Sequence, residues 1–235
     1  GDGFEAFEKN IGRFLSEYGM QSFPEMGTIM KFAEEKDLDI NSKVMKDRQK
    51  ASLGTGNLVK YIEDYFSSQT DFRSIVVLSQ IMQAFAIKTA VEIHRRSMPF
   101  CMGTLYWQFN DCWPAISWSS VDYFGNWKAL HYHAKRFFNE IIIVIYEEGE
   151  HIHISVVNDQ HKKVDSIIKF QLSTFDGSML YEKTFGYTIA EASSNVVYSF
   201  EKKMYLKEKA LSDLFIHAEI RENKKVVCNN KYFFG

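Results

Sequence analysis

A short apolar segment near the start of the chain ends in a carboxylate. Residues 13–18 read RFLSEY, so Glu17 directly follows residues typical of a strand that enters a core. A glutamate is rarely buried without a partner, and moving an ionised carboxylate out of water is costly. Glu17 therefore either lies at a strand end, where the chain emerges, or has a chemical task inside the protein.

A second group of polar and aromatic residues follows the apolar run FCMGTLYWQF at residues 100–109. This run predicts a parallel strand buried on both faces. Trp107, Gln108, Asn110 and Asp111 stand at its end. In βα barrels the catalytic side chains project from the C-terminal ends of the strands. An aromatic face that packs on a pyranose ring, beside carboxylate and amide groups that bind hydroxyls, is typical of a sugar site.

Each of these residues also has a purely structural interpretation. Trp107 is compatible with core packing, and Asn110 and Asp111 with capping of the turn after the strand. Trp113 is a candidate for one wall of a cleft or for a packing residue of the loop. The residue types alone leave these alternatives open.

The elements that position these residues have an α/β order. Helices are expected over residues 56–66, 71–97 and 128–139, the second capped near Asp71 and stopped by Pro99. The order is strand, helices, strand, helix. Because two parallel strands cannot make a stable sheet, we expect residues 1–140 to be part of a larger domain.

The remaining residues, 141–235, have a different pattern. Runs such as HIHISVV, SIIKFQLSTF and DLFIHAEI alternate apolar and polar residues, and turn signals separate them at residues 148–150, 176–178 and 222–224. Alternation with this spacing predicts an immunoglobulin-like antiparallel β-sandwich.

Composition excludes several classes of function. The net charge is −2, with 28 basic and 30 acidic residues, so neither nucleic acid nor an anionic membrane surface is an expected partner. No uninterrupted apolar run reaches the length of a membrane span. Three widely spaced cysteines and scattered histidines predict no disulfide framework, no metal site and no cofactor.

Two motifs carry a resemblance to a known family. The segments RFLSEYGMQSFPEM and CMGTLYWQFNDCWPAISWSSVDYFGNWKALHYHAKRFF strongly resemble the β-mannosidases, in the glycoside hydrolase family that also holds β-galactosidase and β-glucuronidase. The resemblance covers roughly residues 4–140, and the β-rich remainder more weakly. It implies that residues 1–140 are the C-terminal part of a (β/α)8 TIM barrel, with strands seven and eight and their helices, and that residues 141–235 are the sandwich that follows.

The resemblance also implies roles for the singled-out residues. Glu17, in the SEYG motif, is the expected nucleophile of retaining hydrolysis. Trp107 is expected in the floor of the sugar subsite, with Asn110 and Asp111 as hydroxyl ligands and Trp113 as a cleft wall. The acid/base glutamate belongs to an Asn-Glu motif that we place outside this chain, so the chain alone is expected to be inactive.

The implied substrate is a β-mannoside oligosaccharide or glycoside, and the implied partners are the remaining domains of the parent chain. Two alternatives stay open at this stage. One is another β-glycosidase of the family, exo-β-glucosaminidase or β-galactosidase-like. The other is a non-catalytic carbohydrate-binding or scaffold protein, against which the intact motif around Glu17 argues.

Overall fold

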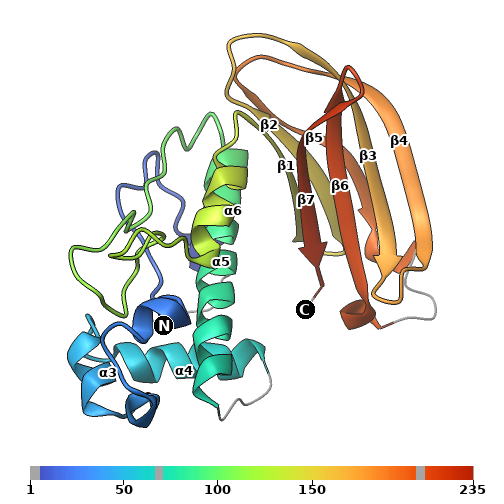
Figure 1. Ribbon diagram of the computed structural model, residues 1–235. Coiled ribbons are helices and arrows are strands. Elements are labelled where there is room, and N and C mark those ends of the chain that lie inside the picture. Colours follow the sequence, from blue (N-terminus) through green and yellow to red (C-terminus); the bar gives the residue numbers. More distant parts are fainter. Residues whose placement is uncertain (1–5, 67–70, 205–209, 235) are drawn as a thin grey trace. The chain divides into compact units, whose positions relative to one another are not determined.

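The computed structural model describes residues 6–66, 71–204 and 210–234. It divides the chain into two compact units, one of residues 1–94 and 101–137, the other of residues 95–100 and 138–235. Figure 1 shows that helices dominate the first unit and strands the second.

The first unit is built from helices joined by long connections. Its helical elements are α1 (Ala6–Lys9), α2 (Met26–Ile29), the 3-10 turn η1 (Glu35–Asp37), α3 (Lys43–Arg48), α4 (Gly54–Tyr65), α5 (Phe72–Arg96, whose last two residues belong to the second unit) and α6 (Ala129–Phe137). The three predicted helices are confirmed as α4, α5 and α6. The side chain of Asp71 accepts a hydrogen bond from the Ser74 backbone N–H (2.9 Å) and so caps the start of α5.

The two strands predicted in this unit form only in part. Among its described residues there are isolated bridges instead of regular strands, one of them a parallel bridge between Leu15 and Thr104. The prediction that residues 100–109 are buried on both faces is wrong. Leu105, Trp107 and Phe109 are 56%, 48% and 60% exposed. They alternate along the segment, as side chains on one side of an extended chain do, and the described part of the chain leaves that side uncovered.

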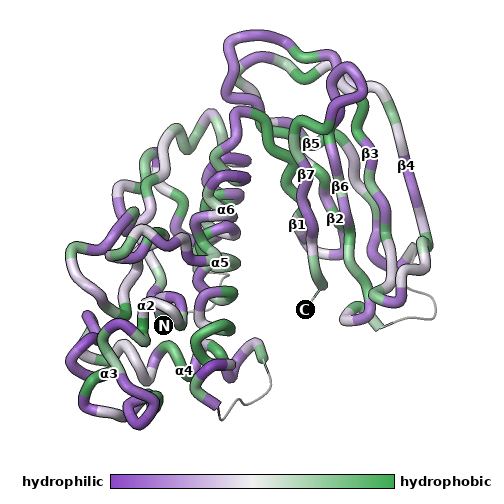
Figure 2. The backbone as a smooth tube through the Cα atoms, in the orientation of Figure 1, coloured by the Kyte–Doolittle hydropathy of each residue, from purple (hydrophilic) through white to green (hydrophobic). Residues whose placement is uncertain are grey.

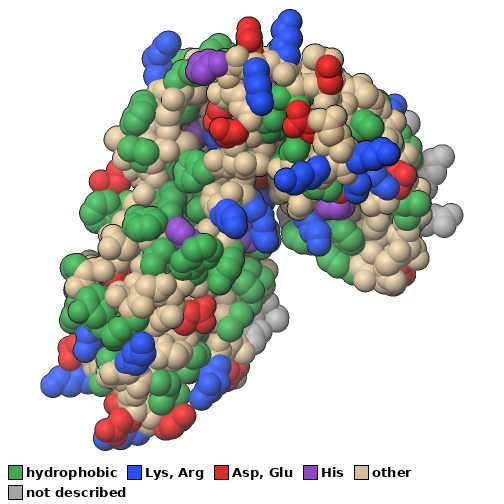
Figure 3. All heavy atoms as spheres, turned by 45° about the horizontal axis from the view of Figure 1, so that its top comes forward, with side chains coloured by type: hydrophobic (Ala, Val, Ile, Leu, Met, Phe, Trp, Pro, Cys, Tyr) green, Lys and Arg blue, Asp and Glu red, His purple; other side chains and the backbone are tan. Residues whose placement is uncertain are grey.

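Two apolar clusters hold the first unit together. One joins α4 and α5 to residues of the connections, through Leu58, Ile62, Phe72, Phe23 and Ile116. The other joins α5 to α6 through Ala84, Ile87, Val91, Leu130, Ala134 and Phe137. Further apolar side chains lie on the surface of this unit, as the face in Figure 3 shows.

Helix α5 is long and apolar enough to cross a membrane by length and composition alone. The sequence-based exclusion of a span was therefore too strict, since it considered only uninterrupted apolar runs. However, 61% of the most apolar 18-residue window is buried inside the protein. Because the helix contributes to both apolar clusters, a core helix of a globular unit is the better explanation.

The second unit consists of two antiparallel sheets. One has the order β1 (Ile141–Glu148), β2 (His151–Asn158), β5 (Ser193–Glu201); the other has the order β4 (Met179–Ile189), β3 (Val164–Thr174), β6 (Leu214–Glu222), β7 (Lys225–Phe233). Two 3-10 turns, η2 (Lys202–Met204) and η3 (Leu211–Asp213), lie between β5 and β6. The predicted antiparallel strands and turns are confirmed.

One apolar core is shared by both sheets. It contains Ile143 of β1, Ile154 of β2, Phe170 of β3 and Ile216 of β6, all at most 1% exposed. Strand β3 alternates buried and less buried residues along its whole length, and Figure 2 shows both hydrophobic and hydrophilic stretches along it. This is the pattern of strands that bury one face and leave the other to solvent.

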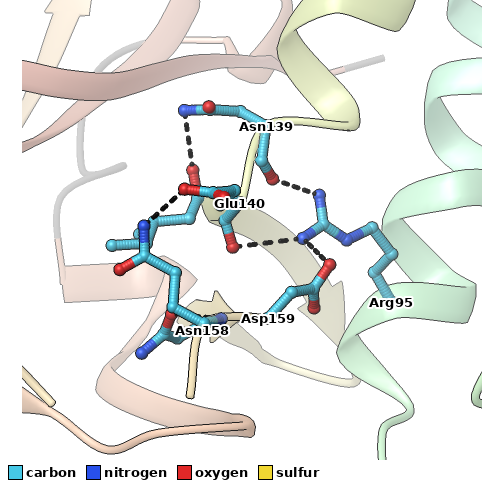
Figure 4. Close-up of polar contacts among 7 residues, drawn as sticks. Arg95, Asn139, Glu140, Asn158 and Asp159 are labelled. Atoms are coloured by element: carbon cyan, nitrogen blue, oxygen red, sulfur yellow. Dashed lines mark hydrogen bonds and ion pairs between the residues drawn. The ribbon is translucent and has the colours of Figure 1, made fainter. Parts of the chain in front are cut away.

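Arg95, near the end of α5, anchors the start of the second unit (Figure 4). Its guanidinium donates to the backbone carbonyl oxygens of Asn139 (2.8 Å) and Glu140 (3.5 Å), and it forms an ion pair with Asp159 (2.7 Å). The Arg95 side chain is 8% exposed, whereas Asp159 is 53% exposed. The arginine therefore pairs with two carbonyl groups just before β1 and with a carboxylate in the turn after β2.

We expect Arg95→Ala to lower the free energy of unfolding by about 1–3 kcal/mol, because the charged donor lost here leaves carbonyl groups unpaired. Asp159→Ala should cost less than about 1 kcal/mol, since a half-exposed ion pair contributes little. Chemical denaturation of each variant measures both values. Lys163→Ala, an exposed cation of the same unit, is the control. Equal losses for Arg95→Ala and Lys163→Ala would contradict the anchoring role.

Candidate functional site

The segment that carries Glu17 runs beside the segment that carries Trp107. The Leu15 N–H donates to the Gly103 carbonyl (2.9 Å), and the Leu15 carbonyl accepts from the Leu105 N–H (2.8 Å). In a parallel pair, one residue forms hydrogen bonds to the two residues that flank its partner, and Leu15 does so with the two neighbours of Thr104. Farther along, the Trp107 N–H donates to the Tyr18 carbonyl (2.7 Å). The two predicted site segments are therefore neighbours.

The Glu17 segment contains one residue more than a regular pairing requires. The donors Leu105 and Trp107 are two residues apart, but their acceptors Leu15 and Tyr18 are three apart. An extra residue of this kind is a bulge, which disrupts the ladder locally and re-aims a side chain. It explains why the predicted strand at residues 13–17 is reduced to a single bridge. Glu17 lies in the bulge and is exposed.

Gly19 permits the close approach of the two segments. A β-carbon at this position would lie 2.1 Å from the carbonyl oxygen of Trp107 and 3.1 Å from the ring of Trp118. No side chain fits when its β-carbon lies 2.1 Å from another atom. The carbonyl oxygen of Trp107 belongs to the backbone, so it cannot turn away as the end of a flexible side chain can. The glycine of the SEYG motif is therefore required by the contact with Trp107.

The loop after Trp107 separates the predicted hydroxyl ligands. Asn110 is exposed, whereas Asp111 is 8% exposed. Both carboxylate oxygens of Asp111 accept hydrogen bonds, one from the Gln108 amide (3.2 Å) and one from the Ser119 hydroxyl (2.6 Å). The Trp107–Gln108 peptide bond is cis. Asn110 is thus presented to solvent, while Asp111 ties the loop together.

Trp113, the predicted cleft wall, is half-buried and covered by cations. The Lys50 ammonium lies 3.8 Å and the Arg48 guanidinium 4.8 Å from the ring centroid. The Arg48 side chain also donates to the Pro114 carbonyl (3.1 Å). Cation–π contacts of this kind hold an aromatic side chain in place, so the arrangement restrains the loop that follows Asp111.

A partly buried polar cluster supports the Glu17 segment from within the unit. The Tyr18 hydroxyl and the Thr104 hydroxyl are 2.6 Å apart, and His94 Nδ1 lies 2.8 Å from the same Thr104 oxygen. Burial raises the pKa of Tyr18 to about 12 and lowers the pKa of His94. Both side chains are therefore uncharged at neutral pH, and they link α5 to the paired segments.

Lys128, which no sequence pattern singles out, is fully buried in this unit. Its Nζ donates to the backbone carbonyl oxygens of Ser22 (3.3 Å) and Ser117 (3.2 Å). A lysine at the start of a helix is ordinarily exposed, so its position in the sequence carries no signal of burial. Only the fold reveals that the amino group bridges the two site segments.

Within the described residues, no group of three or more His, Cys, Asp or Glu side chains is arranged to hold a metal ion. A cavity of about 390 Å³ lies beside the Glu17 segment, lined by Gly19, Met20 and Gln21, by Trp118, and by α1, α4 and α5. None of the five site residues predicted from the sequence lines it. The cavity is thus distinct from the predicted sugar subsite.

A family model, the Mannosidase Ig/CBM-like domain, matches residues 150–235. Curated relatives cover more of the chain. A β-mannosidase from Capra hircus is 35% identical over 202 residues, which are 80% of this chain and 23% of the relative. A β-mannosidase B from Aspergillus terreus is 36% identical over 173 residues, 72% of this chain and 20% of the relative.

Solved structures agree with these matches. The crystal structure of a β-D-mannosidase from Dictyoglomus thermophilum matches 100% of this chain with a TM-score of 0.92 and 33% identity, and the chain covers 29% of it. An exo-chitosanase from Amycolatopsis orientalis has the same fold over 94% of the chain, with a TM-score of 0.79 and 17% identity, and the chain covers 27% of it.

The chain therefore spans about a quarter of the length of the relatives it matches. The match to one β-mannosidase structure extends over the whole chain and includes both units. Sequence and structure together place the chain among the β-mannosidases of the glycoside hydrolase family that also holds β-glucuronidase and β-galactosidase.

Proposed function

We propose that this chain is the C-terminal part of the catalytic (β/α)8 barrel, with the immunoglobulin-like β-sandwich that follows it, of a retaining exo-β-mannosidase. The substrate is a terminal, non-reducing β-D-mannose residue of a β-mannoside. Glu17 is the nucleophile and Trp107 the floor of the sugar subsite. The acid/base glutamate comes from another part of the parent chain. The relatives named β-mannosidase support the substrate class.

One observation carries the proposal. The Trp107 N–H donates to the carbonyl of Tyr18 (2.7 Å), the residue directly after Glu17. The exposed Glu17 therefore lies in a segment paired with the exposed Trp107. Nothing in the described part of the chain pairs with the Glu17 carboxylate, which is therefore available to a ligand. An anion held by backbone pairing beside an aromatic platform matches the needs of an oxocarbenium-like transition state.

The chemistry follows from this arrangement in two steps. Glu17 attacks the anomeric carbon while the second carboxylic acid protonates the leaving oxygen, which forms a covalent glycosyl-enzyme. Water then attacks the same carbon, and the second residue, now a carboxylate, takes its proton and releases mannose. The two carboxyl groups lie about 5–5.5 Å apart in such sites. Asn110, exposed after Trp107, is a hydroxyl ligand in this scheme, and Trp113 limits the cleft.

In the full-length protein we expect Glu17→Gln and Glu17→Ala to lower kcat on an aryl β-mannoside by several orders of magnitude, because no nucleophile remains. Azide should restore turnover in the Ala variant and give the inverted glycosyl azide. Glu63→Gln, an exposed glutamate of α4, should leave kcat unchanged. Labelling with 2-fluoro-mannosyl fluoride and peptide sequencing identifies the nucleophile. A label on a residue other than Glu17 would show that the assignment is wrong.

Gly19→Ala should abolish activity or folding of the first unit, because the added methyl group meets the Trp107 carbonyl oxygen. The matched control is Gly27→Ala, within α2, where a β-carbon has no heavy atom within 4 Å. That change should leave activity intact and the melting temperature the same or slightly higher. Thermal melts and kcat of both variants provide the comparison. Similar behaviour of the two variants would mean that the close approach does not matter.

The isolated chain should hydrolyse no aryl β-mannoside, since it holds one carboxylate of a catalytic pair. The measurement is mannoside turnover by a sample whose folding is verified by circular dichroism and a cooperative melt. Turnover that Glu17→Gln removes would show instead that the chain contains its own acid/base residue.

A further inference from the structure

Lys128 is a buried amino group between the two site segments. Its side chain is 0% exposed, and Nζ donates to the carbonyl oxygens of Ser22 and Ser117. These two serines also pair with each other, through Ser22 N–H to Ser117 O (3.0 Å) and Ser117 N–H to Ser22 O (3.3 Å). The lysine thus adds a second donor to each carbonyl of a single antiparallel bridge.

Burial of this group is costly, so it needs an explanation. The pKa of Lys128 is lowered to about 7, because burial lowers it by more than the carboxylates of Asp111, Asp122 and Glu25 raise it. Both protonation forms retain at least two N–H bonds, so either form can serve both carbonyls. Both carbonyl oxygens that Lys128 serves also accept a backbone N–H, so a hydrophobic residue of similar length at this position would leave neither carbonyl unpaired. Stability alone is therefore a weak reason for a lysine at this position.

In addition to the pairing around Leu15, two points after Glu17 hold the Glu17 segment against residues 107–117 by backbone hydrogen bonds, and Lys128 completes the second of them. The first point is the Tyr18–Trp107 hydrogen bond directly after Glu17, and the second is the Ser22–Ser117 pair. Between them the Gln83 amide of α5 donates to the Met20 carbonyl (2.8 Å). Residues 18–22 are thus fixed at both ends and in the middle.

The same bridge connects to the loop that carries Asp111. The Ser117 hydroxyl donates to the Ser119 hydroxyl (3.0 Å), which donates to Asp111 Oδ2 (2.6 Å). All three residues are buried. A shift of Ser117 would therefore move the Asp111 carboxylate. It would also move Gln108, which donates to that carboxylate and directly follows Trp107.

We infer that Lys128 is a positioning residue, whose amino group locks the Ser22–Ser117 bridge and thereby sets the alignment of Glu17 with Trp107 and the Asp111 loop. The inference rests on the proposed function of Glu17. It assigns Lys128 no contact with the sugar. Its effect on turnover is through geometry, since a misplacement of about 1 Å in a reacting group costs about 10²-fold in rate.

The test compares three variants of the full-length protein on p-nitrophenyl β-D-mannopyranoside. Lys128→Met removes the donors but keeps the aliphatic packing, and should lower kcat roughly 10- to 100-fold with a smaller change in KM and an unchanged or raised melting temperature. Lys128→Gln keeps an N–H donor and should recover part of kcat. Lys135→Met, an exposed lysine of α6, should behave as the wild type.

Hydrogen exchange separates this inference from the proposed function. In Lys128→Met the amides of residues 18–22 and 115–120 should exchange faster than in Lys135→Met, whether or not the protein hydrolyses mannosides. If the wild type is inactive, the proposed function fails. Hydrogen exchange alone then shows whether Lys128 stabilises the Ser22–Ser117 bridge. Unchanged exchange with unchanged kcat in Lys128→Met overturns the inference. Loss of folding in both Lys128 variants overturns it too, because the amino group would then serve the fold and not the alignment.

Discussion

The pairing of residues 13–22 with residues 102–117 is the constraint on which the first unit depends. It joins positions about ninety apart in the sequence and closes the chain around α2 to α5. Closing so long a loop is costly in entropy, and that cost must be met by contacts formed afterwards. The bonds are between backbone groups, so the bonds themselves require no particular side chain. Gly19 is the exception, because there the two backbones are too close for a β-carbon.

The two units differ in the polarity of the side chains that they bury. The second unit has an apolar core of isoleucine, valine and phenylalanine between two sheets. The first unit buries Gln83, Ser119 and Lys128 as well as apolar groups. Buried polar groups are costly unless each is paired, but a fully paired network defines one geometry. In the described residues the one buried side-chain atom without a partner is Gln160 Oε1, which belongs to the second unit. The polar interior lies beside Glu17, the proposed nucleophile.

The sequence was a good guide wherever a regular pattern determined the structure. The three helices and the antiparallel strands follow from periodicity and turn residues. The bulge at Glu17 could not be predicted, because it depends on the register between two distant segments. The exposed side of Leu105 and Phe109 was missed for a related reason, since an apolar run shows that a residue can be buried but not what covers it. The burial of Lys128 is set by tertiary contacts that leave no trace in local sequence.

That uncovered side bears on how the proposed site becomes complete. Trp107 shares it with Leu105 and Phe109, two residues away in each direction. A sugar ring stacked on Trp107 would cover one aromatic face and little of the two flanking side chains. In the proposed barrel, other strands cover the rest, and burial of apolar area contributes roughly 25 cal/mol per Å². In a closed barrel the neighbouring strands do this, and such strands also carry catalytic groups at their C-terminal ends. Under the proposed function, the cover of Leu105 and Phe109 and the second carboxylate are thus one structural requirement, met by the same part of the parent chain.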